Sequence, residues 1–278
     1  MGRLCGFVAG TGDRKVMHGM GLDGVTLLLG CLSGFLSGLL GIGGGVVLLP
    51  SLLYLLPLLH GARLSVFSAT EISMVQVAFA SLTGILVHRP SAHVPLSRLF
   101  FWAGSALAGG AAGAFLSSRL SGRTILWIFL LETILALTLL LFRPREGEVP
   151  GRRDPGRLPG EFFALSAIGL SSGILGVGGG FLLYPVLTLL FGYPSFVAVG
   201  SSLAVMFPMA AVAATTKVWV SGGLPSQTVT IVAGALVGSF LGARFTRRLG
   251  ASRIRLFQGG LLLLTALRVV VGLASGGG

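Results

Sequence analysis

Long apolar segments separated by short polar ones organise this chain. No Asp, Glu, Lys, Arg or His occurs between residues 24 and 59 or between residues 162 and 216. A helix of about 20 apolar residues crosses a bilayer core of about 30 Å, so the second run is long enough for at least two crossings. The apolar pattern predicts helices over residues 22–58, 64–87, 97–118, 123–142, 161–191, 196–219, 226–246 and 254–274.

Composition favours an all-α integral membrane protein. Charged residues make up 10% of the 278 residues and hydrophobic residues 53%, whereas a soluble domain carries roughly 25% charged residues because its surface faces water. The alternation of apolar and polar residues that marks a membrane β-barrel is absent. The formal net charge is +12, but the cations lie between apolar runs, which indicates contact with membrane lipid rather than nucleic acid.

The two halves of the chain resemble each other. Residues 32–52 align with residues 167–187 at an offset of 135, which places the triplet Gly43–Gly45 on Gly178–Gly180. Two further matches, Gly109/Gly238 and Gly113/Gly242, occur at an offset of 129. Matches in equivalent places with equivalent flanks indicate an internal duplication.

The duplication predicts two tandem four-helix repeats with about eight transmembrane helices. The predicted organisation is an N-terminal arm over residues 1–20, membrane repeat 1 over 21–142, a polar linker over 143–160 and membrane repeat 2 over 161–278. Duplicated membrane units are common in transporters, where the substrate is held near mid-membrane between the repeats.

Two glycine clusters, Gly41–Gly45 and Gly176–Gly180, interrupt the two longest apolar segments. Each glycine weakens a helix by about 1 kcal/mol relative to alanine, and backbone released inside a membrane must find partners or line a cavity. We therefore expect the first helix of each repeat to be broken at its glycine cluster. The following half-helix would point free N–H groups into the interior, which suits an anion without a buried Lys or Arg.

Two alternatives apply to these clusters. The triplets could merely permit packing or a kink, although close packing needs glycines four apart rather than three in a row. Such spacing occurs separately at Gly34/Gly38, Gly109/Gly113, Gly169/Gly173 and Gly238/Gly242, which we interpret as helix interfaces. Alternatively, each long segment could form a hairpin, which would give an odd number of passes per repeat and an inverted pair; we favour four crossings and a parallel pair.

The paired S-G-x-x-G-x-G-G-G elements at residues 37–45 and 172–180, each followed by Pro, resemble the sulfite exporter (TauE/SafE) family of membrane transporters. The Val199–Leu203 cluster is similar to that family as well. The resemblance covers about residues 20–275. It implies a secondary transporter of sulfite, sulfonates or related sulfur-containing anions, driven by an ion gradient and located in the cell membrane.

We predict a substrate site formed by both glycine clusters and nearby hydroxyl groups, which can donate hydrogen bonds to an anion. Its residues are Ser37, Gly41, Gly43, Gly44, Gly45, Thr70, Ser172, Gly176, Gly178, Gly179, Gly180, Ser201 and Ser202. Glu71 interrupts an apolar segment, where an ionisable group is costly unless it faces a cavity or a partner. It is interpreted as a proton or cation coupling group or, equally, as a structural partner of Lys217 or Arg63.

The remaining polar residues give weaker indications of function. Glu132 is interpreted as a structural pair, and Lys217 either as an interface anchor or as an attractor of anions. His88, Arg89, His93 and Arg98 fall in a loop that we expect to be solvated. The spacing of these groups predicts no metal site, and neither a cofactor motif nor an enzymatic nucleophile–base arrangement is present.

The sequence therefore favours a secondary transporter of a small sulfur-containing anion, coupled to a proton or sodium gradient. The alternative is a passive anion channel, which would need a continuous polar-lined path and no second ion. A membrane enzyme or assembly partner would need a catalytic arrangement or a substantial soluble domain. The pattern specifies neither membrane orientation nor oligomeric state.

Overall fold

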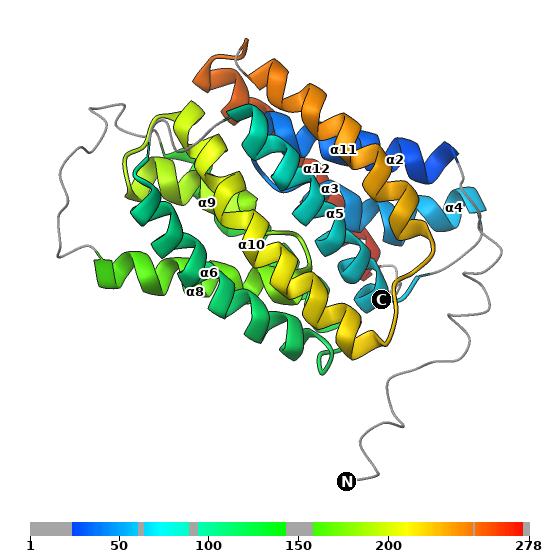
Figure 1. Ribbon diagram of the computed structural model, residues 1–278. Coiled ribbons are helices and arrows are strands. Elements are labelled where there is room, and N and C mark those ends of the chain that lie inside the picture. Colours follow the sequence, from blue (N-terminus) through cyan, green and yellow to red (C-terminus); the bar gives the residue numbers. More distant parts are fainter. Residues whose placement is uncertain (1–23, 61–63, 89–93, 143–157, 247, 275–278) are drawn as a thin grey trace, which may run out of the picture.

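The computed structural model describes residues 24–60, 64–88, 94–142, 158–246 and 248–274. Its regular secondary structure in these ranges is entirely helical (Figure 1). The predicted N-terminal arm and most of the predicted linker lie outside the described residues. Within the described ranges, six helices are long and apolar enough to cross a membrane. They are α5 (Val66–His88), α6 (Leu96–Ser117), α7 (Gly122–Leu141), α10 (Ser195–Ser221), α11 (Gln227–Thr246) and α12 (Ala251–Ala274), and each matches a predicted segment within a few residues.

The two longest predicted segments are each divided at their glycine cluster. The first contains α2 (Gly24–Leu40), α3 (Gly45–Pro50), the π-helical turn η1 (Ser51–Leu55) and α4 (Leu56–His60). The second contains α8 (Leu158–Leu175), α9 (Gly180–Pro185) and the π-helical turn η4 (Val186–Leu190). Both π-helical turns directly follow a proline, which lacks the N–H group that a regular α-helix needs there.

The chain reverses direction at each glycine cluster. A methyl group added at Gly44 would lie 2.5 Å from the carbonyl oxygen of Ser33, although residues eleven apart in a straight helix are separated by about 16 Å. In the second segment, Trp102 contacts a residue near the start of the segment and one just after its end. Its indole N–H donates to Glu161 at 2.8 Å, and its ring centroid lies 5.5 Å from that of Tyr193. We name these segments hairpin 1 (residues 24–60) and hairpin 2 (residues 158–190).

These reversals correct our preference for one broken crossing in each segment, because they agree with the hairpin alternative. The physical reason is length. The 17 residues of α2 already span about 26 Å, so the helical residues after Gly44 exceed what a single crossing needs.

Helices α5 and α10 pack against each other in antiparallel directions at the centre of the bundle (Figure 1). Ser221, at the end of α10, donates to Glu71 near the start of α5, whereas Phe196, near the start of α10, packs on His88 at the end of α5. Helices α2 and α11 flank this pair on one side, and α6 and α8 flank it on the other. The first leg of each hairpin therefore packs on a long helix from the other half of the chain.

Glycines form the contacts of both flanking pairs. A methyl group added at Gly38 of α2 would lie 2.2 Å from the carbonyl oxygen of Ser239, and one added at Gly173 of α8 would lie 2.2 Å from that of Gly110. Such backbone contact is possible only without a side chain. The interpretation of the glycines spaced four apart as helix interfaces is confirmed for all four pairs, which are Gly34/Gly38, Gly109/Gly113, Gly169/Gly173 and Gly238/Gly242.

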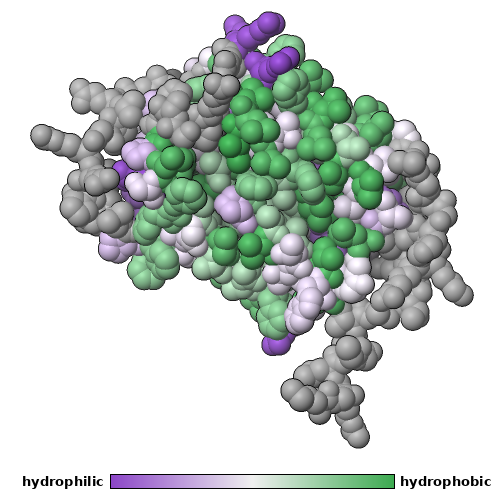
Figure 2. Space-filling model, in the orientation of Figure 1, coloured by the Kyte–Doolittle hydropathy of each residue, from purple (hydrophilic) through white to green (hydrophobic). Residues whose placement is uncertain are grey.

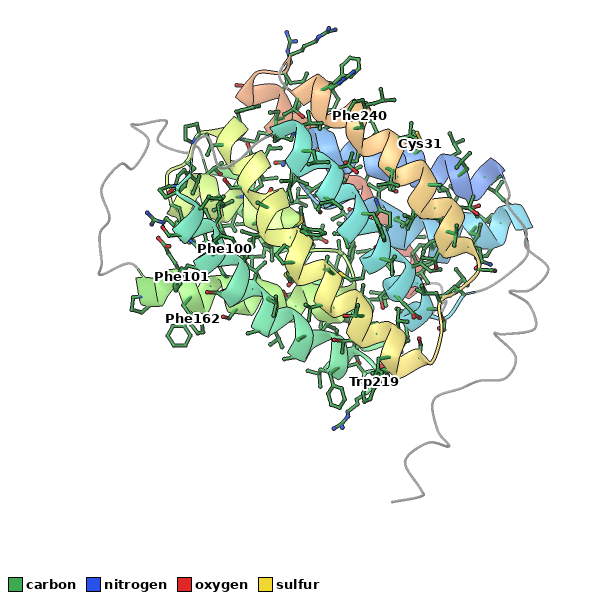
Figure 3. The ribbon with its side chains drawn as sticks, viewed as in Figure 1. Cys31, Phe100, Phe101, Phe162, Trp219 and Phe240 are labelled. Carbon is green, nitrogen blue, oxygen red and sulfur yellow. The ribbon has the colours of Figure 1, made fainter. Side chains whose placement is uncertain are left out.

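The outer surface carries many large apolar side chains. The exposed fraction is 83% for Leu141, 80% for Trp219 and 73% for Phe100. Figure 2 shows apolar residues across most of one face, with strongly hydrophilic ones towards its ends. Figure 3 shows Phe100 and Phe162 projecting outward from α6 and α8. Such a surface is typical of a protein that faces lipid.

Candidate functional site

The two glycine turns have nearly the same backbone conformation. The φ angles are 68°, 87° and 64° at Gly41, Gly43 and Gly44, and 70°, 83° and 63° at Gly176, Gly178 and Gly179. Residues with a Cβ rarely adopt positive φ, so glycine is needed at each of these positions. The interruption of the helix that the triplets predicted is present in both halves.

The two turns contact each other in the interior. A methyl group added at Gly45 would lie 2.7 Å from the Cα atom of Val177, and one added at Gly180 would lie 2.6 Å from the carbonyl oxygen of Gly41. Both turns are buried. Around them, α5 contributes Ser73, Gln76 and Val77, and α10 contributes Val199, Ser202 and Met206. The site therefore lies between the hairpin turns and the middle of the two central helices.

Backbone donors without acceptors gather at these turns. In the described structure, the first turn has three amide N–H groups that donate no hydrogen bond, those of Ile42, Gly43 and Gly44. The second turn has the equivalent three, those of Val177, Gly178 and Gly179, and the N–H group of Gly180 donates none either. Leaving a buried N–H group unpaired costs about 1–3 kcal/mol. Unpaired donors gathered at one place can bind an acceptor, such as an oxygen atom of an anion.

The predicted hydroxyl residues lie near the turns but differ in their hydrogen bonds. The hydroxyl groups of Ser37, Ser172 and Ser201 are buried and have no partner among the described residues. Ser202 donates to the carbonyl oxygens of Gly41 and Val199, both at 2.9 Å. Thr70 donates to the carbonyl oxygen of Phe67, so neither Ser202 nor Thr70 has a free donor.

Sequence reasoning missed two polar residues of α5. The hydroxyl group of Ser73 and both amide atoms of Gln76 are buried without a partner in the part of the chain that the structure describes. The amide nitrogen of Gln76 lies 3.0 Å from where a Cβ of Gly44 would be, and the hydroxyl oxygen of Ser73 lies 2.7 Å from where one of Gly45 would be. The available signal was a glutamine in an otherwise apolar segment, since an uncharged amide in lipid also needs a partner.

Lys217 is fully buried, contrary to its interpretation as an interface anchor. Its ammonium group donates to the hydroxyl oxygens of Thr70 at 2.9 Å and Ser117 at 2.8 Å, and to the carbonyl oxygen of Ile174 at 3.3 Å. The nitrogen also lies 5.0 Å from the ring centroid of Phe67. Because these three hydrogen bonds use all three ammonium protons, the geometry does not favour a direct contact with an anion.

His88 occupies the matching position at the other end of the molecule. It was expected in a solvated loop but is buried. Its Nε2 atom lies 3.1 Å from the carbonyl oxygen of Gly38, and its ring centroid lies 5.5 Å from that of Phe196. Thr246 donates to the neighbouring carbonyl oxygen of Leu39. Each hairpin thus has a basic residue and a hydroxyl group at the carbonyl end of its first leg.

The buried acids lie in different surroundings. Glu71 accepts a hydrogen bond from Ser221 at 2.7 Å, close enough to Lys217 for attraction between the charges. Glu132 has the hydroxyl group of Ser171 beside its carboxyl group, although no cation pairs with it in the described residues. Arg98 was also expected to be solvated, but it forms an ion pair with Glu161.

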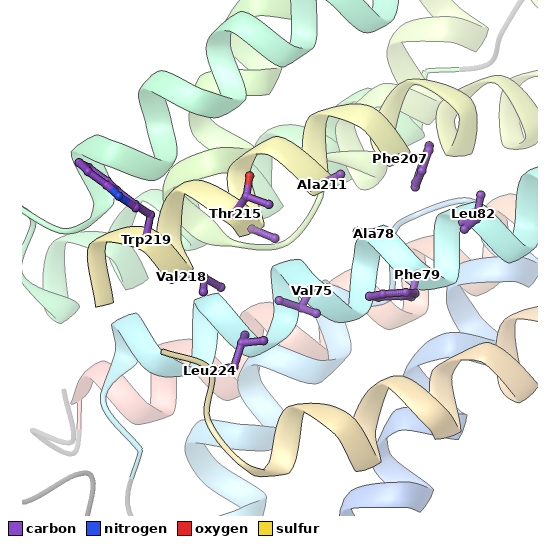
Figure 4. Close-up of a pocket in the computed structure, with 11 residues that line it drawn as sticks. Val75, Ala78, Phe79, Leu82, Phe207, Ala211, Thr215, Val218, Trp219 and Leu224 are labelled. Atoms are coloured by element: carbon purple, nitrogen blue, oxygen red, sulfur yellow. The ribbon is translucent and has the colours of Figure 1, made fainter. Parts of the chain in front are cut away.

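An apolar groove of about 530 Å³ opens between α5 and α10 (Figure 4). Phe79, Leu82, Phe207 and Trp219 are among its lining residues, none of which is charged. Such a surface cannot coordinate an anion but suits contact with lipid. Among the described residues, no group of three or more His, Cys, Asp or Glu side chains could hold a metal ion.

The chain is similar in sequence to known membrane proteins. Residues 26–269 match the family described as "Sulfite exporter TauE/SafE". The chain is 26% identical over 267 residues to the probable membrane transporter protein YunE of Bacillus subtilis (strain 168), which covers 88% of this chain and 96% of that protein. It is 28% identical over 257 residues to a probable membrane transporter protein of Xylella fastidiosa (strain Temecula1 / ATCC 700964), covering 89% and 94% respectively. No solved structure matches significantly.

The family match covers most of the chain, and the relatives match along nearly their whole length. Together with the long apolar helices, these matches identify a multi-pass membrane transporter and not an enzyme. The chain belongs to the sulfite exporter TauE/SafE family.

Proposed function

We propose that this protein is a secondary transporter that carries a small sulfur-containing anion, such as sulfite or a sulfonate, across the cytoplasmic membrane. The two glycine turns would bind the anion between them. The observation that carries this proposal is the set of six buried amide N–H groups, at Ile42–Gly44 and Val177–Gly179, that have no acceptor in the described structure.

The chemistry of the turns suits such an anion. Successive backbone N–H groups in turns of this kind form concave anion sites, and an anion with several oxygen atoms on one sulfur can accept from more than one of them. The amide group of Gln76 and the hydroxyl groups of Ser37, Ser73 and Ser172 supply further donors. Neutral donors hold an anion without a fixed ion pair, and this favours reversible binding.

The architecture supports a carrier with two repeats of inverted topology. Each repeat would consist of one hairpin and three long helices, rather than the four helices that we expected. Contacts recur at matching positions. Lys217 packs on Phe67, and His88 packs on Phe196; Ser117 donates to Ile174, and Thr246 donates to Leu39. Inverted repeats support alternating access by rocking around a fixed central site.

A gradient-coupled carrier is favoured over a passive channel. The glycine turns and their neighbours on α5 and α10 are buried, so they do not resemble the wall of an open pore. We propose that Glu71 is the coupling group for a proton or a sodium ion. It is a buried carboxyl group in a membrane helix, and such groups commonly mark ion pathways.

Uptake by proteoliposomes tests the proposal. Labelled sulfite, an alkyl sulfonate and a carboxylate of similar size would be supplied under an imposed proton or sodium gradient. We expect uptake of the sulfur anions to depend on one of the two gradients and to show counterflow. Uptake without counterflow or gradient dependence would indicate a channel instead, and uptake of the carboxylate alone would overturn the proposed substrate.

A further inference from the structure

We propose that Lys217 is a clamp on hairpin 2 that is controlled by the charge of Glu71. When Glu71 is neutralised by a proton or a sodium ion, Lys217 leaves the hairpin and this end of the protein opens. The inference deepens the coupling step of the proposed function and rests on it. We name the two ends of the molecule the Lys217 end, where α5 begins, and the His88 end, where α5 ends.

The geometry makes Lys217 a link between three helices. Its hydrogen bonds reach Thr70 on α5, Ser117 on α6 and Ile174 on α8. Ile174 lies two residues before Gly176, the first glycine of the second turn, and a methyl group added at Gly176 would lie 2.2 Å from the carbonyl oxygen of Thr70. Withdrawal of Lys217 would therefore release the second glycine turn from α5 and α6.

Charge balance at this end depends on Glu71. Glu71 follows Thr70, which accepts from Lys217. Its carboxyl group accepts from Ser221, one turn after Lys217 on α10. The charge of Glu71 therefore acts on the ammonium group of Lys217, yet the two do not form an ion pair within 4.0 Å. The other described acids lie elsewhere, since Glu132 is in the middle of α7 and Glu161 is at the start of α8. The carbonyl end of α8 adds a partial negative charge beside the ammonium group.

The other charges that the structure describes near this end, among them Arg119 and Arg123, are cationic and exposed. The guanidinium group of Arg119 lies 4.7 Å from the ring centroid of Phe115, and Arg123 is in the first turn of α7. Neither can compensate Lys217. Once Glu71 is neutral, the buried ammonium group would keep its hydrogen bonds but lose its counter-charge, which is strongly unfavourable in a buried site.

Lys217 has a route out of the interior. It lies four residues before Ser221, the last residue of α10, and a lysine side chain can extend along a helix to place its ammonium group in water. A proton or cation at Glu71 destabilises the conformation in which Lys217 is buried more than the one in which its ammonium group is in water. It therefore favours the released conformation.

The His88 end lacks this control. At an offset of 129, Gly200 occupies the position that corresponds to Glu71. Hairpin 1 is held by His88 and Thr246, without an acid at the equivalent place. We therefore expect ion binding to open the Lys217 end selectively.

Cysteine alkylation in nanodiscs, where both faces are accessible, tests this clamp without any substrate. Cys5 and Cys31 would first be replaced by serine and alanine. One reporter, Ala69→Cys, is next to Thr70 at the Lys217 end, and the other, Ala198→Cys, is the matching residue at the His88 end. Both positions are fully buried. The ratio of the two alkylation rates reports opening of the Lys217 end, because the general dependence of thiol ionisation on pH affects both reporters.

We expect Glu71→Gln to raise this ratio about tenfold at neutral pH, which corresponds to about 1.4 kcal/mol. The substitution should also abolish the increase that acid or sodium produces in the unmodified protein. Lys217→Met should raise the ratio similarly, and adding Glu71→Gln should then have no further effect. If Lys217→Met does not give monodisperse protein, Lys217→Gln replaces it.

Glu132→Gln is the matched control, because it neutralises another buried acid, whose carboxyl group faces Ser171 and not Lys217; it should leave the ratio unchanged. An unchanged ratio in Glu71→Gln, an equal increase in Glu132→Gln, or additive effects of the Glu71 and Lys217 substitutions would overturn the clamp. If the alkylation ratios behave as predicted but the unmodified protein takes up no sulfite, the proposed substrate is refuted and the clamp is not.

Discussion

Hairpins 1 and 2 have the same backbone but different side-chain surroundings. Corresponding glycines in the two turns differ by at most 4° in φ, and both turns leave the N–H groups of the same three positions without an acceptor in the described structure. At the carbonyl end of the first leg, however, hairpin 1 has His88 and hairpin 2 has Lys217 with Glu71 nearby.

This difference separates two tasks. The shared backbone suits a substrate site on a pseudo-twofold axis, because both halves present the same donors. Glu71, beside Lys217, has no acidic counterpart beside His88, because Gly200 occupies the matching position; such an asymmetry is expected for a device that links one gate to an ion. Substitutions can test separately the features that the two hairpins share and the features in which they differ.

The largest effect is expected from alanine in a glycine turn. Gly44→Ala should reduce sulfite uptake to background, because a positive φ costs about 1–2 kcal/mol for a residue with a Cβ and the methyl group would lie 2.5 Å from the Ser33 carbonyl oxygen. Gly179→Ala should retain more uptake, since its methyl group meets only side chains, at 3.0 Å or more. Gly104→Ala, which adds a methyl group in open space, is the control and should transport normally.

A smaller effect is expected at the helix interfaces, and it should be equal in both halves. Gly38→Ala and Gly173→Ala should each lower the free energy of unfolding by about 1–3 kcal/mol through overpacking, since each methyl group would lie 2.2 Å from a carbonyl oxygen. Thermal unfolding in detergent, followed by tryptophan fluorescence, measures this. Gly260→Ala, with no atom within 4 Å, should not destabilise. Loss of stability in one half alone would contradict the equivalence of the two interfaces.

Gln76 is a further difference between the two halves, because the matching residue in the second half is Val205. Gln76→Leu should raise the KM for sulfite by about fivefold, the effect of losing one hydrogen bond of about 1 kcal/mol. Val205→Leu should leave the KM unchanged. Concentration-dependent initial uptake rates provide the measurement, and equal KM values for the two variants would exclude Gln76 from the site.

The smallest effect is expected at Glu132. Its carboxyl group faces Ser171 rather than the glycine turns, so Glu132→Gln should leave both the uptake rate and its gradient dependence unchanged. Parallel flux assays under proton and sodium gradients would check this. A loss of gradient dependence would move the coupling role from Glu71 to Glu132.

The broken helices could be predicted from sequence, whereas the path of the chain around them could not. Three consecutive glycines in an apolar segment have few uses other than a turn, and both turns are present. The reversal depends on contacts between distant residues, such as those of Trp102 with Glu161 and Tyr193. Segment length alone agreed with either a long broken crossing or a hairpin.

The sequence predicted the part of the candidate site that depends on backbone conformation better than the part that depends on contacts between side chains of different helices. Gly43 and Gly178 follow from the repeat, but the depth of Lys217 does not. A lysine near a helix end looks like an interface anchor until Thr70 and Ser117, from two other helices, are placed around it. Gln76 could have been recognised as an uncharged polar group in an apolar segment.

Amide resonances of the glycine turns test the central claim most directly. Labelling glycine with 15N and with 13C at the carbonyl restricts a carbonyl-correlated amide spectrum to glycines that follow glycine. These include Gly44, Gly45, Gly179 and Gly180 in the turns, and Gly110, Gly223 and Gly260 elsewhere. Titration with sulfite should shift the amide signals of Gly44 and Gly179 with one shared binding curve and leave those of Gly110, Gly223 and Gly260 in place. Unshifted Gly44 and Gly179 signals in a preparation that transports sulfite would contradict the account.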